Sequence, residues 1–277
     1  MAGPIITLTT DFGATDGFVG VLKGVILGIN PSATIVDITH EVPPQNIQAG
    51  AFTFGTAHRY FPADTIHVVV VDPGVGTSRR PILVIGPQAC YVAPDNGVLS
   101  YLFPEAKAPA APVDAFTPIH VSLPEGWRAY HLMNSHYWHH PVSSTFHGRD
   151  VFAPVAAHLS NGVAPVNMGD PVKTVAAFVI PTPVLDAGVL LGCVLHTDRY
   201  GNIITNVTTE DLPLIPNAQV TVRIGGRKID GLATSYQDAD LVALIGSHGY
   251  LEVAARNGNA AKLLGVSTGG EVTVTVG

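Results

Sequence analysis

The sequence is short of charged residues and contains no run of basic ones. Only 13% of its 277 residues are Asp, Glu, Lys or Arg, and the formal net charge is −7. Nucleic-acid grooves and proteins that bind anionic membrane surfaces need clustered Lys and Arg, which this chain does not have. We therefore expect neither a nucleic acid nor a membrane among its partners.

Cysteine and long apolar runs are also scarce. The two cysteines, Cys90 and Cys193, lie far apart in apolar stretches, which favours buried free thiols over a disulfide framework or a zinc site. The opening MAGPIITLTTDFG lacks the basic and apolar regions of a signal peptide. No uninterrupted apolar run reaches transmembrane length. These absences predict a cytoplasmic protein.

What the sequence does have is apolar residues, at 47% of the chain, which is enough for a large core. In its first part, strand-like runs at 5–9, 34–38 and 65–71 alternate with helical patterns at 18–29 and 46–59. This alternation is typical of a parallel sheet covered by helices. Further strands are expected at 82–85, 90–93 and near 119–121, a further helix at 150–159, and mostly loop elsewhere in 104–138.

The pattern changes from about residue 188 onward. Short strand-like runs such as QVTVRIG and DLVALIG recur about every ten residues between turn signals, with one short helix at about 259–264. We therefore expect an α/β N-terminal domain with a mostly parallel sheet over residues 1–180. A smaller, all-β, barrel-like C-terminal domain is expected over 188–277, with a linker at about 181–187.

Two carboxylates follow strands of the expected sheet, where ligands of open α/β sheets bind. Asp11, in TTDFG, is placed to accept hydrogen bonds from two sugar hydroxyls, or else simply caps the next helix. Asp72 begins the loop DPGVGTSRR, whose glycines let Arg79 fold back toward it. An active-site pair and a structural ion pair at a turn both fit this second pattern.

Histidine is frequent, with 12 residues, so any single one is a weak signal. His147, in SSTFHGRD, stands out because it precedes a glycine at an expected loop-to-helix junction. Four other histidines cluster nearby, but their spacing matches no zinc or iron pattern, so we expect a solvated loop and no metal site. These four are His131, His136, His139 and His140.

The expected C-terminal domain carries one further polar motif. Asp198 and Asn202, in DRYGN, are followed later by the stretch GSHGYL at 246–251. Asp and Asn side chains together can hold an ammonium group and a purine edge. Alone, DRYGN is also compatible with a plain β-turn.

As an ordered set, these motifs resemble the SAM hydroxide adenosyltransferases, over nearly the whole chain. The resemblance implies hydrolysis of S-adenosyl-L-methionine (SAM) to adenosine and L-methionine by activated water at C5′, with SAM as substrate and no cofactor. It also implies a homotrimer whose active sites lie between the large domain of one subunit and the small domain of its neighbour. The motifs that carry it are TTDFG, DGFVG, VVVDPGVGTSRR, APDNGVLS, SSTFHGRDVFAPVAAHL, DRYGNIITN and IGSHGYLEVA.

The resemblance also implies a role for individual residues. Asp72, Arg79 and His147 correspond to the water-activating triad, although which of Asp72 and His147 takes the proton stays open. His248 receives no role. The substrate-binding positions implied are Asp11 for ribose, Asp198 and Ser247 for the methionine ammonium and carboxylate, Asn202 for adenine, and Tyr236 for stacking on adenine.

Two alternatives belong beside hydrolysis. Relatives that attack SAM with halide carry a tyrosine at the position of Asp72, a Tyr-Ser pair at His147-Gly148 and a long loop insertion that is absent here, so water is the expected nucleophile. A SAM-binding sensor without turnover would need Asp11, Asp198 and Ser247 but not the triad. Retention of all three triad residues favours the enzyme.

Overall fold

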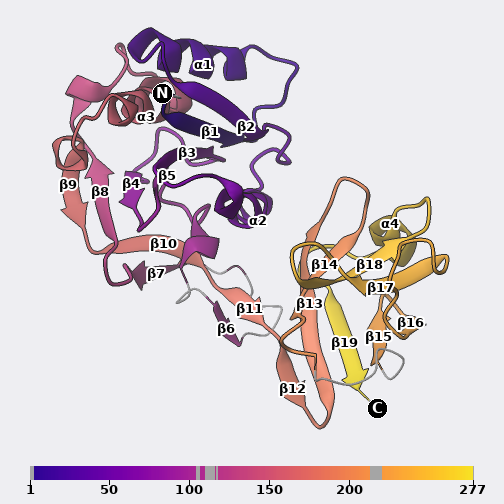
Figure 1. Cartoon of the computed structure of the whole chain (residues 1–277). Coiled ribbons are helices and arrows are strands. Elements are labelled where there is room, and N and C mark those ends of the chain that lie inside the picture. Colours follow the sequence, from indigo (N-terminus) through magenta and orange to yellow (C-terminus); the bar gives the residue numbers. More distant parts are fainter. Residues whose placement is uncertain (1–2, 104–106, 110–115, 117, 213–219, 277) are drawn as a thin grey trace. The chain divides into compact units, whose positions relative to one another are not determined.

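The computed structural model describes residues 3–103, 107–109, 116, 118–212 and 220–276. The chain divides into two compact units, one of residues 1–106 and 118–178 and the other of residues 107–117 and 179–277 (Figure 1). Strand β6 (Lys107–Pro109) therefore belongs to the second unit, where it pairs with β11 (Ile180–Thr182). Within the described residues, no helix has the length and apolar character needed to cross a membrane.

A mixed sheet of seven strands forms the centre of the first unit, in the order β2-β1-β3-β5-β4-β8-β9. Strands β2, β1, β3 and β5 are parallel, β4 runs against β5, and β8 runs against β4, so five strands share one direction. The expected mostly parallel sheet is confirmed. The strands are β1 (Ile5–Thr10), β2 (Thr34–Thr39), β3 (Thr65–Val70), β4 (Pro81–Ile85), β5 (Ala89–Pro94), β8 (Arg128–Leu132) and β9 (Gly169–Val172).

The expectation of mostly loop over 104–138 is wrong for β8. This strand pairs with β4, and Ala129, Tyr130 and Leu132 are buried. Its five residues are too few to give a clear period, and its other partner, β9, follows some forty residues later, so local sequence gave little signal. The strand expected near 119–121 is confirmed as β7 (Pro118–Ser122), which pairs with β10 (Thr174–Phe178).

Helices cover both faces of this sheet (Figure 1). α1 (Phe18–Ile29) and α3 (Ala153–Ser160) pack together on one face, and α2 (Ile47–Ala57) packs on the other. α2 begins where the Asn46 side chain accepts a hydrogen bond from the Ala49 backbone N–H at 2.9 Å. Short 3-10 turns lie at His58–Tyr60, Ser100–Leu102, Ser135–Tyr137 and Pro165–Asn167.

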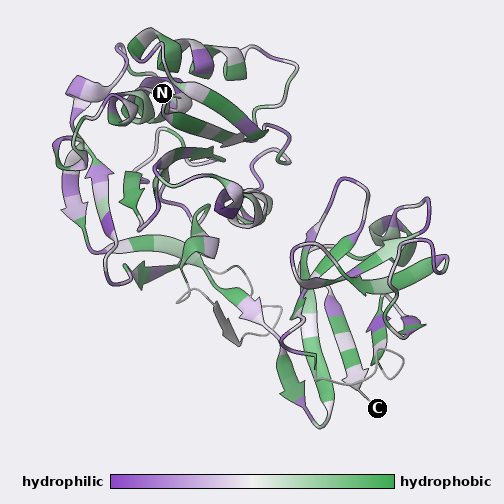
Figure 2. Cartoon of the chain, in the orientation of Figure 1, coloured by the Kyte–Doolittle hydropathy of each residue, from purple (hydrophilic) through white to green (hydrophobic). Residues whose placement is uncertain are grey.

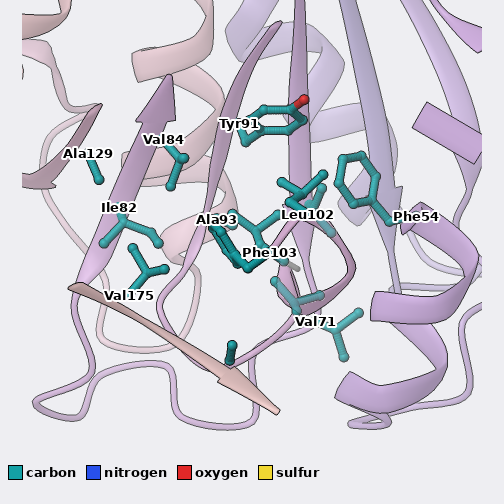
Figure 3. Close-up of a cluster of buried hydrophobic side chains, with 14 of the residues drawn as sticks. Phe54, Val71, Ile82, Val84, Tyr91, Ala93, Leu102, Phe103, Ala129 and Val175 are labelled. Atoms are coloured by element: carbon teal, nitrogen blue, oxygen red, sulfur yellow. The ribbon is translucent and has the colours of Figure 1, made fainter. Parts of the chain in front are cut away.

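The valine-rich β3 region serves both of the resulting core layers, because successive side chains of a strand point to opposite faces. Val68 and Val70 belong to the layer with Leu22 of α1. Val69 and Val71 belong to the other layer, which contains Phe54 of α2, Tyr91, Ala93 and Phe103, as labelled in Figure 3. Figure 2 shows the hydrophobic colouring of these central strands. Burial on both faces explains why most of β3 is apolar, and its two polar residues, Thr65 and His67, are hydrogen-bonded.

The second unit is built around an antiparallel, barrel-like sheet in the order β16-β15-β19-β13-β14-β18-β17, with β12 paired to β13. This confirms the expected all-β fold. Its interior contains Val194, Ile203, Val222, Val253 and Val274. The elements are β12 (Val184–Asp186), β13 (Val189–Thr197), β14 (Ile203–Thr208), β15 (Val220–Ile224), β16 (Arg227–Asp230), β17 (Leu241–Ile245), β18 (Tyr250–Ala255), α4 (Ala260–Leu264) and β19 (Glu271–Val276). Strands β11 and β12 occupy most of the expected linker.

Candidate active site

Two acidic residues, Asp11 and Asp72, follow neighbouring strands of the first unit's sheet and lie at the same edge of it. Parallel strands β1 and β3 pair Thr10 with Val70, so the chain continues into Asp11 on one strand and into Asp72 on the other just beyond this point. Both residues, together with His147, line a cavity of about 230 Å³. The cavity therefore lies at the carboxyl end of the central strands, where α/β sheets bind ligands.

Arg79 links Asp72 to His147. Its Nε lies 3.0 Å from each carboxylate oxygen of Asp72, and its Nη2 donates both to Oδ2 of Asp72 and, at 2.9 Å, to Nδ1 of His147. The guanidinium also lies over the Phe152 ring, 5.3 Å from its centre. The side chains of Arg79 and Asp72 are only 9% and 6% exposed. Such a charge-assisted pair, shielded from water, holds the carboxylate in one orientation.

This contact also fixes the protonation of His147. A guanidinium can only donate, so the Nδ1 atom that faces Arg79 must be unprotonated, and a neutral ring then carries its proton on Nε2. Burial first, and the positive charge of Arg79 second, hold the pKa of His147 below 6.5, against the opposing charges of Asp72 and Asp150. His147 therefore presents an Nε2–H donor at neutral pH.

Two loops must fold closely together to build this triad. Gly76 has a φ of +76°, and a Cβ there would lie 2.3 Å from the Ser144 carbonyl oxygen, so only glycine fits. On the other loop, the buried Asp150 carboxylate accepts a hydrogen bond from the Ser143 backbone N–H at 2.8 Å. His147 immediately precedes a π-helical turn, Gly148–Phe152, before α3; such turns occur frequently at functional sites.

Asp11 is held by a hydrogen bond from another residue that lines the cavity. The backbone N–H of Gln45 donates to its Oδ2 at 2.7 Å. Gln45 has a φ of 65°, an unusual conformation for a residue other than glycine. The aromatic rings of Phe12 and Phe146 also line the cavity and pack edge to face, 5.8 Å apart. Sequence reasoning missed these three residues, although each is a sequence neighbour of a polar motif.

In the second unit, two of the candidate residues, Asp198 and Asn202, lie in the turn between β13 and β14. Asp198 accepts hydrogen bonds from the backbone N–H of Asn202 at 2.8 Å and from its Nδ2 at 3.0 Å. The Asn202 carbonyl oxygen Oδ1 makes no hydrogen bond within the described part of the chain. Gly201, with a φ of +87°, packs against Asn259 so closely that a Cβ would clash. The motif is thus a tight turn that leaves one amide acceptor available.

Tyr236 and Ser247 are placed differently. The Tyr236 hydroxyl donates to Oε1 of Glu252 at 3.0 Å, and Tyr236 as a whole is 44% exposed. Glu252, which sequence reasoning also missed, is 7% exposed. Ser247 and His248 lie in the exposed turn between β17 and β18, and no hydrogen bond joins Ser247 to the other candidates among the described residues.

The histidine cluster makes isolated contacts. His139 Nδ1 lies 3.6 Å from Asp150, whereas His140 Nε2 contacts the Ser135 carbonyl oxygen at 2.8 Å. Within the described ranges, no three His, Cys, Asp or Glu side chains are arranged to hold a metal ion.

Comparison of the sequence with known protein families and proteins gives two matching family profiles and several full-length relatives. The profile of the SAM hydroxide adenosyltransferase N-terminal domain matches residues 6–169, and that of the C-terminal domain matches residues 192–273. An (R)-S-adenosyl-L-methionine hydrolase of Salinispora arenicola is 36% identical, over 99% of this chain and 98% of its own. A fluorinase of Actinoplanes sp. is 28% identical, over 98% and 97%.

A solved structure agrees. The crystal structure of an uncharacterized conserved protein from Thermotoga maritima superposes with a TM-score of 0.83 at 35% identity, covering 98% of this chain and 99% of its own. Both profiles and the full-length relatives lead to one conclusion: this chain belongs to the SAM hydroxide adenosyltransferase family.

Proposed function

We propose that this protein hydrolyses SAM at C5′, releasing adenosine and L-methionine. The observation that carries the proposal is the Asp72–Arg79–His147 arrangement beside the cavity of the first unit. Full-length relatives named (R)-S-adenosyl-L-methionine hydrolase support it, and their name points to the (R) epimer at sulfur as the substrate. No cofactor is needed for this reaction, since SAM already carries its leaving group.

The chemistry requires a positioned nucleophile. The oxygen of water attacks C5′ while the C5′–S bond breaks and its electron pair passes to sulfur, so methionine leaves as a neutral thioether. One water proton is released, and the cationic sulfonium is consumed. Holding the reacting atoms in line can lower the barrier by roughly 7–11 kcal/mol in ideal cases.

The hydrogen bonds around Arg79 divide the roles within the triad. Because Nδ1 of His147 accepts from Arg79, its Nε2–H can donate to the water oxygen but cannot take a proton from it. Asp72 is then the proton acceptor, with Arg79 stabilising its charge. The phenyl rings of Phe12 and Phe146 give the cavity an apolar wall.

The substrate contacts follow from the remaining side chains. Asp11 would accept hydrogen bonds from the ribose hydroxyls in the same cavity as the triad. In the second unit, the free Oδ1 of Asn202 would accept from the adenine amino group, and the Tyr236 ring would stack on the base. Asp198 and Ser247 would bind the methionine ammonium and carboxylate.

Water is favoured over halide by the presence of Asp72 and His147 beside the cavity. Gly148 fits the local packing, because a Cβ there would lie 3.1 Å from the Phe12 ring and 3.3 Å from the Phe146 ring, so a larger side chain would need small shifts of these rings. A SAM sensor without turnover would have no use for the buried Asp72–Arg79 pair. Neither alternative accounts for the triad.

The direct test is incubation with each epimer of SAM, with and without chloride, followed by chromatography. Adenosine and methionine in equal amounts, from the (R) epimer and independent of chloride, are expected. If 5′-chloro-5′-deoxyadenosine is the main product in chloride, the enzyme transfers halide and does not hydrolyse SAM. If SAM binds but stays unchanged, the protein is a sensor.

We further propose a homotrimer in which each active site combines the first unit of one subunit with the second unit of its neighbour. The proposed triad and Asp11 belong to one unit, and the proposed adenine and methionine residues belong to the other. A contact between two different surfaces closes into a ring when three copies repeat it. The cytoplasmic location and the domain limits drawn from sequence stay predictions.

Complementation tests the shared site. Asp72→Ala and Asp198→Ala are each expected to be nearly inactive alone, because one damages every triad and the other every methionine site. Refolded together in equal amounts, half of the first units and half of the neighbouring second units are intact, so about a quarter of wild-type activity returns. Mixed trimers that stay inactive, or an active monomer by light scattering, would rule out the shared site.

A further inference from the structure

A buried carboxylate lies beneath Tyr236 with no role in the proposed reaction. Glu252 projects from β18, which is flanked by β14 and β17, and only 7% of it is exposed. None of the ion pairs of the described chain includes it, and its one hydrogen bond there comes from the Tyr236 hydroxyl. A buried acid without a cationic partner is costly, so its retention needs a reason.

The surroundings of Glu252 fix its carboxylate in place. A Cβ on Gly246 would lie 2.3 Å from Oε2, so glycine at the end of β17 leaves the space that this oxygen fills. The other oxygen, Oε1, receives the hydroxyl of Tyr236 at 3.0 Å. The carboxylate is therefore a fixed anchor on a rigid strand, and the tyrosine is the group that it holds.

Tyr236 needs such an anchor because it lies in the irregular segment between β16 and β17. Asp238 fixes the backbone of this segment by accepting hydrogen bonds from the N–H groups of Thr234 and Ser235, at 2.9 and 3.2 Å. Within the described parts of the chain, the ring of Tyr236 makes no aromatic contact, and the residue is 44% exposed. Its hydroxyl bond to Glu252 is thus what restrains the ring while leaving its face open.

Nearby negative charges keep the Tyr236 hydroxyl protonated, so that it remains the donor in its hydrogen bond to Glu252. Burial, the bond to Glu252 and the negative charges of Glu252 and Asp198 raise the pKa of Tyr236 to about 12, so its hydroxyl stays a donor. Burial and the charge of Asp198 also raise the pKa of Glu252, while the bond from Tyr236 opposes the rise. Asp198, of the turn that also contains Asn202, thus acts on both groups through its charge.

We propose that Glu252 is a positioning residue that holds the Tyr236 ring, through its hydroxyl, in the orientation in which it stacks on the adenine of SAM. This inference rests on the proposed function and adds a residue to it. Ordering the ring before the substrate arrives removes a cost from binding. It acts on the affinity for the adenosine moiety and not on the chemical step at C5′.

Tyr236→Phe keeps the ring and removes the tether, so it tests the proposal with little risk to folding. We expect the KM for SAM and the Kd for adenosine, measured by calorimetry, to rise by the same factor of about three to ten, the usual effect of one hydrogen bond. The kcat and the Kd for methionine should stay unchanged. Tyr60→Phe, at an exposed tyrosine of the first unit, is the matched control.

Glu252 variants complete the test. Glu252→Ala should raise the KM as Tyr236→Phe does, the double variant should show no further rise, and Glu252→Gln, which keeps an acceptor for the hydroxyl, should restore the wild-type KM. Wild-type KM and adenosine affinity in Tyr236→Phe, with only a lower Tm, would overturn the proposal. Because adenosine binding is measured without turnover, this outcome is distinct from a wild-type protein that makes no adenosine from SAM.

Discussion

Asp72→Asn is expected to lower kcat by about 10²–10⁴, the usual contribution of a positioned acid–base group. Asparagine has nearly the same shape, but it cannot take a proton from water and leaves the Arg79 charge without its carboxylate. The KM should change much less, because the proposed ribose and methionine contacts lie elsewhere. Single-turnover rates with saturating SAM measure the chemical step directly.

Asp95 provides a matched control for this substitution. It is also a buried carboxylate of the first unit, paired with an arginine, Arg80, and its Oδ1 accepts from the Ala176 backbone N–H at 2.6 Å. It does not line the cavity. Asp95→Asn should therefore lower the Tm while keeping kcat, and wild-type kcat in Asp72→Asn would show that Asp72 is a structural ion pair only.

His147→Ala is expected to lower kcat by a similar factor of about 10²–10⁴. The variant removes the Nε2–H donor that faces the cavity and leaves Arg79 Nη2 without one of its acceptors. His136→Ala, at an exposed histidine of the neighbouring cluster, should behave as wild type. Equal loss of activity in both variants would point to a general effect of altering this region instead of a role for His147.

The pH dependence follows from the same histidine. Because the pKa of His147 is lowered from 6.5, the folded protein keeps its ring neutral at pH 7, and protonation begins only as the pH falls further. We expect kcat/KM to be constant from pH 7 upward and to fall with a midpoint below 6.5. The unfolded chain binds this proton more readily than the folded protein does. The free energy of unfolding therefore also decreases as the pH falls below 6.5. A midpoint above 7 would contradict a neutral His147.

The sequence predicted which residues of the first unit lie close together, although their roles stay predictions. Asp11 and Asp72 follow two apolar strands, and parallel pairing alone brings such residues to one edge. The approach of Arg79 to Asp72 follows from the glycines of their short loop. These features depend on local sequence patterns and on the rule that parallel strands end at the same edge of a sheet, so they can be predicted from sequence.

Residues that depend on distant pairing were not accessible in this way. Glu252 reads as an ordinary polar position of a strand until β14 and β17 are seen to flank it and Tyr236 to cover it. Gln45 holds Asp11 through its backbone N–H, and such a contact cannot be predicted from a pattern of side chains. Strand β8 was likewise missed because its pairing with β4 joins segments far apart in sequence.

The most direct test of the central claim is turnover of SAM in water enriched in oxygen-18, followed by mass spectrometry of the nucleoside. Attack of activated water at C5′ predicts adenosine that carries one heavy oxygen in its 5′-hydroxyl, formed in a single turnover with methionine unlabelled. Unlabelled adenosine, or a 5′-halogenated nucleoside as the main product, would contradict the account.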